Sequence, residues 1–176
     1  MFCLYPKEYI EYLVHFHGSR DYFECHEILE DYWKRVDAAH KESVWVGFIQ
    51  LAVSSYHHRR SNFAGAKKTL ATAKRIFLQN EQKLKKLGMD PQKMAVMLEH
   101  LSDLIDKGKP YESFRLPLND PVLISKCQKL ANQLGLDFEN NRDVTNAEIV
   151  HRHRLRDRTS VIQTRQEALK KKKGSD

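Results

Sequence analysis

Residues 44–53 of this chain are apolar with the single exception of Gln50. A helix that is apolar on every side has to be enclosed by other elements of the fold. The stretch therefore predicts a central, buried helix that runs from Ser43 to about Arg60. Gly47 within it costs about 1 kcal/mol relative to alanine, which indicates that a neighbouring helix approaches closely there.

The rest of the chain also has the composition of a helical protein. Only seven glycines and five prolines occur in 176 residues, and they separate segments whose apolar residues recur at helical spacing. The predicted helices are 6–18, 21–36, 43–60, 62–87, 91–108 and 121–135, with an extended strap over 109–119. The short turn before Asn62 predicts an antiparallel helical hairpin. We expect an all-α fold, a compact antiparallel bundle of about six helices in residues 1–135, followed by a basic extension in 136–176.

The compartment is predicted from what the sequence lacks. The N-terminus has no basic leader, and no segment offers the roughly 18 apolar residues of a membrane span. The three cysteines, Cys3, Cys25 and Cys127, have no CxxC spacing, which argues against a disulfide framework or a zinc knuckle. We expect a cytoplasmic protein in which Cys25 is a small buried residue rather than a nucleophile.

Polar residues occur on helix faces that are otherwise apolar. At about 100° per residue, His26 and Glu30 share a face with Tyr22 and Trp33, whereas Glu27 lies on an acidic stripe on the other side. In the next helix, Gln50 and His57 point in one direction. If these faces meet, His26, Glu30, Gln50 and His57 form one buried cluster, flanked by Trp33.

Burying such groups unpaired costs about 1 to 3 kcal/mol each, so they are expected to satisfy one another. Three interpretations remain open. The favoured one is a structural polar network in a binding or scaffold module with an unknown protein or small ligand as partner, because buried polar groups are usually paired internally. A second is a site for a small polar ligand in a cleft between helices. Its candidate residues are His26, Glu27, Glu30, Trp33, Gln50, His57, His58 and Arg60.

The third interpretation is a metal-dependent hydrolase that uses His26, Glu27, Glu30 and His57. Imidazole and carboxylate groups ligate divalent zinc, manganese or iron, and His26, Glu30 and His57 are the candidate ligands. The spacing departs from known motifs, because the helix carries His-Glu-x-x-Glu where the zincin motif has a second histidine.

The C-terminal extension concentrates the positive charge of the chain. Residues 149–174 contain nine lysines and arginines against two acids, a local net charge of +7, which equals that of the whole chain. Such a tail attracts nucleic acid or another polyanion, or else keeps the terminus solvated. The candidate contacts are Arg152, Arg154, Arg156, Arg158, Lys170, Lys171, Lys172 and Lys173. The capping-box pattern of 145–148 predicts that part of this extension is helical.

Several of these segments, read in order, resemble a known family. They are Tyr22 to Trp33, Gly47-Phe-Ile-Gln-Leu-Ala52, Tyr56-His-His-Arg-Arg60 and Asn62-Phe-Ala-Gly-Ala66. Over about residues 16–80 the chain resembles the bacterial and archaeal family catalogued as domain of unknown function 309. The resemblance implies a compact all-helical fold and no established activity, although a metal-dependent hydrolase role has been suggested for such sequences. It marks as family-pattern positions His26, Glu27, Glu30, Trp33, Gln50, His57, Asn62 and Gly65.

Overall fold

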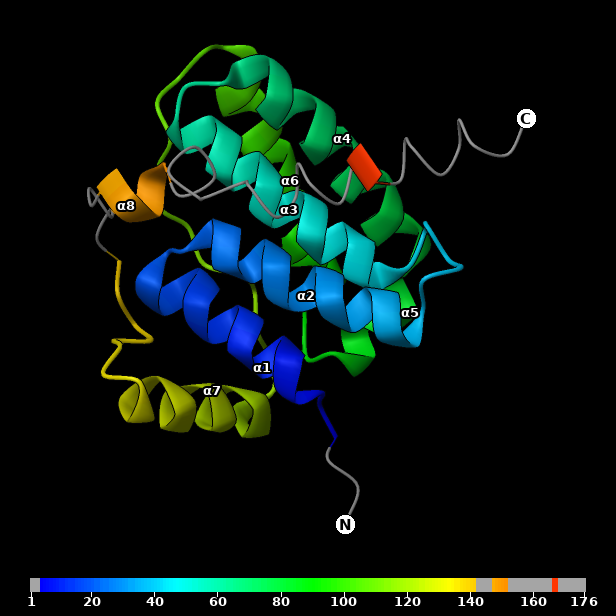
Figure 1. Cartoon of the computed structure of the whole chain (residues 1–176), viewed down its shortest axis with the longest axis vertical. Helices are drawn as coiled ribbons and strands as arrows, with labels where there is room; N and C mark the ends of the chain where they lie inside the picture. Colours follow the sequence, from blue (N-terminus) through cyan, green and yellow to red (C-terminus); the bar gives the residue numbers. More distant parts are fainter. Residues whose placement is uncertain (1–3, 142–146, 152–165, 168–176) are drawn as a thin grey trace.

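Helix α3, Val44–Arg59, lies between α2, Tyr22–Val36, and α4, Phe63–Gln79 (Figure 1). The computed structural model describes residues 4–141, 147–151 and 166–167. Ten of the sixteen residues of α3 are buried, and they cover most of its circumference, whereas Val46, Gln50, Val53 and His57 form one side that is only partly buried. The predicted central helix is therefore confirmed.

The hairpin of α3 and α4 depends on Gly47. A Cβ atom on this residue would lie 2.8 Å from Cε1 of Phe77 and 3.0 Å from Cγ2 of Ile76, both near the end of α4. The start of α3 therefore packs against the end of α4, as an antiparallel hairpin requires. The predicted close approach at Gly47 is confirmed.

Helix α1, Lys7–Val14, continues into a π-helical turn, His15–Ser19. The sequence predicted an α-helix ending at Gly18, but the turn ends at Arg20, which has a left-handed backbone with φ of 54°. This conformation is unfavourable for arginine, so surrounding contacts have to hold it. The guanidinium of Arg20 is fully buried and donates to the carbonyl oxygens of Phe114 and Asn140.

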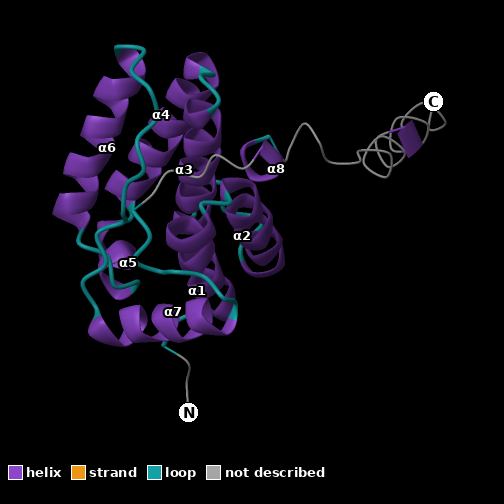
Figure 2. Cartoon of the chain, turned by 90° about the vertical axis from the view of Figure 1, so that its left-hand side faces the viewer, coloured by secondary structure: helices purple, strands orange, loops and turns teal. Residues whose placement is uncertain are grey.

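The remaining helices surround this centre. They are α5, Glu81–Lys86, α6, Pro91–Asp106, α7, Pro121–Gln133, and α8, Ala147–Val150. Helix α6 packs against α4, while α7 crosses one end of the molecule against α1 (Figure 2). Within the described residues the chain contains helices and no strand, apart from an isolated bridge between Met89 and Leu118. The predicted all-α class is confirmed.

Polar side chains cap the N-termini of most of the long helices, at starts that the sequence predicted. Each of these residues accepts a hydrogen bond from a backbone amide in the first turn: Asp21, Ser43, Asn62, Asp90 and Asp120. One predicted helix, 62–87, is interrupted at Asn80 instead of continuing. The side-chain amide of Asn80 donates to the carbonyl oxygens of Ile76 and Glu42. The local bond to Ile76 competes with the backbone hydrogen bonds of the helix.

The predicted strap over 109–119 is extended and passes beside the ends of α2 and α3. Four side chains hold it. His17 accepts from the amide of Leu116, Arg20 donates to the carbonyl of Phe114, His58 donates to that of Lys109, and Tyr22 bonds Tyr111 through their hydroxyls. Polar groups from distant elements therefore fix the strap.

The folded part continues beyond α7. Phe138 is 4% exposed, and its ring packs edge-on against the imidazole of His17 with a centroid distance of 5.0 Å. Arg115 donates to the carbonyl oxygen of Phe138 at 2.7 Å. Residues 136–140, which the sequence assigned to the extension, thus pack on the helical domain. The basic residues predicted to bind polyanions lie outside the described residues.

None of the helices in the described ranges is both long enough and apolar enough to cross a membrane.

Candidate functional site

His26 lies on α2 between two carboxylates of the same helix. Its Nε2 atom is 2.9 Å from Oε2 of Glu30, one turn further along, and its Nδ1 atom is 3.3 Å from Oε1 of Glu27. The other oxygen of Glu30 accepts from Nζ of Lys34 at 2.7 Å. Because residues four apart share a helix face, these groups form a charged row along α2.

This row lies at the edge of the buried face of α2 rather than within it. The side chains of His26 and Glu30 are 26% and 29% exposed. The residues that α2 buries are Tyr22, Cys25 and Leu29, whose mean direction is roughly 70° from that of His26. The prediction of a buried site was wrong, because the core covers the Cys25 side of the helix.

The four predicted polar groups do not meet in one hydrogen-bonded cluster. His26 and His57 lie on opposite walls of a shared groove. Within the described part of the chain, no hydrogen bond connects Gln50 to either histidine. Trp33 lies near the other end of α2, where its indole donates to the carbonyl oxygen of His40 at 3.1 Å.

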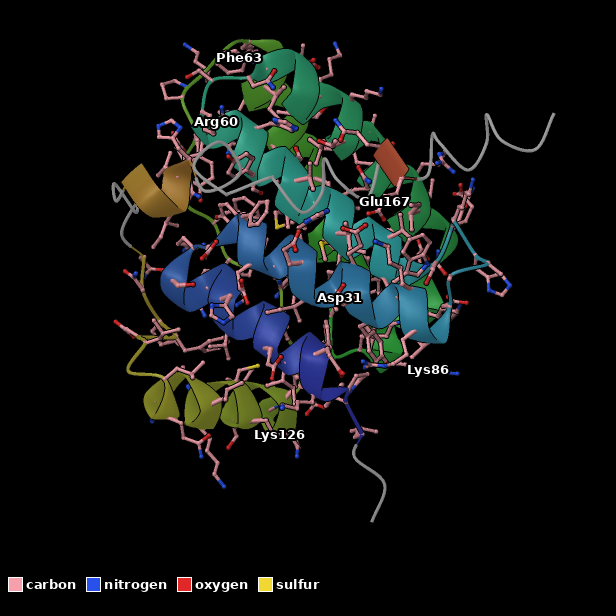
Figure 3. The ribbon with its side chains drawn as sticks, viewed as in Figure 1. Asp31, Arg60, Phe63, Lys86, Lys126 and Glu167 are labelled. Atoms are coloured by element: carbon pink, nitrogen blue, oxygen red, sulfur yellow. The ribbon has the colours of Figure 1, made fainter. Side chains whose placement is uncertain are left out.

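The groove between α2 and α3 contains a half-open cavity of about 180 Å³. In the part of the chain that the structure describes, its lining consists of aromatic rings, imidazoles, one guanidinium and one aliphatic side chain, without a carboxylate. The residues are Tyr22, Phe23 and His26 from α2, with Val53, Tyr56, His57 and Arg60 from α3 and its end. Arg60 stands at the end of α3, well separated from Asp31 on the outer side of α2 (Figure 3).

The orientation of His57 is set by the start of α4. Oδ1 of Asn62 accepts from the amide of Gly65 at 3.1 Å, so the amino group of Asn62 is the group that faces Nδ1 of His57 at 3.0 Å. An amino group only donates, hence Nδ1 accepts and neutral His57 carries its proton on Nε2. A Cβ on Gly65 would lie 2.8 Å from Nδ2 of Asn62.

Arg60 and His58 follow His57 in sequence but have different locations and contacts. The guanidinium carbon of Arg60 lies 4.9 Å from the centre of the Tyr56 ring, and its Nε atom is buried without a hydrogen-bond partner. His58 is buried on a different side of α3, where it donates to the carbonyl oxygen of Lys109 in the strap at 2.9 Å. His58 was a candidate ligand-site residue, and the structure places it outside the groove, because successive residues are about 100° apart.

A metal centre is the other candidate arrangement. Among the described histidines, cysteines and acids, the one group of three with ligand atoms within 4.8 Å of one another is His26, Glu27 and Glu30. The predicted combination of His26, Glu30 and His57 is not brought this close. His57 stands on the opposite wall, with Nδ1 turned to Asn62.

Sequence reasoning missed the two most deeply buried polar groups, His17 and Arg20. Burial lowers the pKa of His17 well below its ordinary value, and the neighbouring Arg115 and Arg20 lower it further. The imidazole is therefore neutral, with Nε2 accepting from the amide of Leu116 at 2.9 Å. A single sequence carries no signal for this role, since the partner is 99 residues away.

The described cysteines are not nucleophiles. Cys25 and Cys127 are free thiols in the core. Burial raises the pKa of Cys25 well above its ordinary value and that of Cys127 to about 12. Both remain protonated at neutral pH, in agreement with the prediction for Cys25.

A second cavity, between α4 and α6, is more apolar. Its described lining residues, which include no histidine, are Lys74, Arg75, Phe77, Leu78, Glu81, Leu84, Pro91, Met94, Ala95, Leu98 and Glu99, and Lys74 forms an ion pair with Glu99. The groove between α2 and α3 contains two histidines and therefore offers more groups for ligand binding than this second cavity.

Comparison with known proteins places the groove in a shared segment. Residues 9–69, which include all the groove residues, match the family described as Domain of unknown function (DUF309). The chain is 41% identical over 172 residues to the uncharacterized protein YpuF of Bacillus subtilis (strain 168), which covers 98% of this chain and 99% of that protein. No solved structure gives a significant match. The chain belongs to the DUF309 family.

Proposed function

We propose that this protein is a binding module that takes a small ligand in the groove between α2 and α3. The observation that carries the proposal is that both histidines of the groove have one ring nitrogen engaged by a specific partner. Glu30 engages Nε2 of His26, and Asn62 engages Nδ1 of His57. Histidines held in this way are pre-oriented for binding, as metal- and substrate-binding histidines commonly are.

The surroundings of these histidines support a ligand site. The walls are aromatic and aliphatic, and a few polar groups converge on them, which is the composition of small-molecule sites. The location within residues 9–69 connects the groove with what this chain shares with its family.

Fragment binding followed by NMR tests the proposal. We expect aromatic fragments to shift the methyl signals of Val53. The substitution Val53→Phe fills the groove and abolishes the binding, whereas Ala95→Phe, which fills the cavity between α4 and α6, leaves it intact. Equal binding by both variants would contradict the proposed site.

The second candidate function is a metal-dependent hydrolase, favoured by the convergence of His26, Glu27 and Glu30. One imidazole and two carboxylates are donors that suit zinc, manganese or iron. These residues fit a divalent ion as a partial ligand set on one helix, with coordination positions left for water or a ligand. A bound ion would supply Lewis-acid chemistry at the mouth of the groove.

Metal analysis distinguishes the two candidates. For a hydrolase, protein purified without chelator from medium supplemented with these metals retains about one equivalent, and EDTA lowers its melting temperature. Glu27→Gln with Glu30→Gln removes the metal, while Glu24→Gln on the same helix is the matched control. An unchanged melting temperature and no bound metal would contradict the hydrolase and favour the binding module.

We place the protein in the cytoplasm. Free thiols at Cys25 and Cys127 support a reducing compartment.

A separate activity, polyanion binding, is proposed for the tail. Its nine cations would release counterions from phosphates, so binding weakens steeply with salt. A salt titration against DNA, RNA and anionic vesicles compares the full chain with one ending after Asn141, which keeps the packed residues 136–140. Equal affinity of the two chains would show that the tail does not contribute to polyanion binding.

A further inference from the structure

We infer that the ligand of the groove between α2 and α3 is a small aromatic anion, an aryl carboxylate or aryl phosphate whose charged group meets Arg60 and the Nε2 proton of His57. This inference rests on the proposed binding function and adds the chemical class of the ligand.

The charge of the groove is the first argument. Among the described residues, Arg60 is the one permanently charged residue that lines it, and no carboxylate does. Arg60 forms no ion pair with a described residue, whereas Arg35, Arg75 and Arg115 each pair with a glutamate. The guanidinium is held by stacking on Tyr56, which leaves its charge without an ion-pair partner among the described residues. An anion is the natural partner of such a group.

The proton position on His57 is the second argument. Gly65 fixes the amide of Asn62, and Asn62 in turn fixes Nδ1 of His57 as an acceptor. The opposite nitrogen, Nε2, therefore donates. The α3 wall thus combines a donor imidazole with a guanidinium, and both favour a negatively charged ligand.

The carboxylates nearby do not reverse this preference. Both oxygens of Glu30 are engaged, one by His26 and the other by Lys34. Glu27 lies 3.3 Å from Nδ1 of His26. Neither glutamate lines the groove, so among the described residues the permanent charge that a ligand in the groove meets directly is that of Arg60.

The size of the cavity limits the ligand. A cavity of about 180 Å³ is slightly larger than the roughly 150 Å³ that accommodates benzene in a protein core. One ring with one charged substituent fits into this volume. The rings of Phe23 and Tyr56, with centroids 6.4 Å apart, provide aromatic contacts for the ring of the ligand.

Four probes test the assignment on the full chain: benzoate, phenyl phosphate, benzyl alcohol and acetate. Affinities are measured from shifts of the Val53 methyl groups and the His57 ring. We expect benzoate or phenyl phosphate to bind about tenfold more tightly than benzyl alcohol, and acetate to bind weakly, because charge and ring both contribute. The tighter of the two anions identifies carboxylate or phosphate.

The variant Arg60→Met removes the preference and brings benzoate and benzyl alcohol to similar affinities. Arg75→Met, at the edge of the cavity between α4 and α6, is the matched control and leaves the preference unchanged. Benzyl alcohol binding as tightly as both anions to the wild-type chain would overturn the anion assignment while the groove remained a binding site. Absence of any Val53 shift with all four probes would overturn the proposed function as well.

Discussion

The amide of Asn62 donates to Nδ1 of His57 across the turn between α3 and α4, at a distance of 3.0 Å. The same side chain caps α4 by accepting from the amide of Gly65, whose missing Cβ leaves room for it. A helix cap and the orientation of a groove histidine are therefore one structural unit. The unit explains physically why an asparagine and a glycine three residues apart belong together here.

Asn62→Asp separates the two roles. Aspartate caps a helix about as well as asparagine, so the free energy of unfolding changes by less than about 0.5 kcal/mol. The carboxylate cannot donate to Nδ1, so the proton of neutral His57 moves from Nε2 to Nδ1. Ring ¹⁵N shifts of His57, recorded at about pH 8 where imidazoles are neutral, measure this tautomer. An unchanged tautomer would show that Asn62 does not set it.

The substitution Gly47→Ala has two opposing effects on the free energy of unfolding, one from local helix propensity and one from tertiary packing. Helix propensity alone favours alanine by about 1 kcal/mol. Contact of the new methyl group with Phe77 and Ile76 costs about 1 to 3 kcal/mol, because the core is already filled. We expect a net loss of about 1 kcal/mol in urea denaturation. A stabilised variant would mean that α4 moves away without cost.

His17 makes stability depend on pH. Its pKa is lowered in the folded protein, so below its ordinary value of about 6.5 the unfolded chain binds a proton that the folded chain excludes. The free energy of unfolding therefore falls as pH decreases through this value, by up to about 1.4 kcal/mol per pH unit, until the folded pKa is reached.

Urea denaturation between about pH 5.5 and 7.5 measures this slope while most carboxylates stay ionised. The variant His17→Gln keeps an acceptor for the amide of Leu116 and does not titrate, so it has a shallower slope. The same slope in both proteins would assign the pH dependence to other groups.

The substitution His26→Ala is expected to destabilise the fold less than it would if His26 belonged to a buried polar cluster. The sequence predicted a loss of at least about 1 kcal/mol from unpaired buried partners. Since Glu30 is partly exposed and keeps Lys34, we expect less than about 1 kcal/mol, the usual range for such surface pairs. Urea midpoints measure it, and a loss above about 2 kcal/mol would restore the buried network.

Features that depend on near neighbours in the chain could be predicted from local sequence patterns. All-round apolarity identified α3 as the central helix, Gly47 predicted a close helix contact, and Asp21, Ser43 and Asn62 marked helix starts. Caps and periodicity act within about one helical turn, so their signals are written in consecutive residues.

Long-range packing sets which side of each helix the core covers and which partners the polar groups bond. The wheel placed His26 and Glu30 with large apolar residues, yet the buried direction of α2 is centred near Cys25. His17 bonds an amide in the strap, and the buried guanidinium of Arg20 reaches Phe114 and Asn140. These partners lie about a hundred residues away in sequence, and a polar group buried by folding bonds whichever group the packing brings within reach.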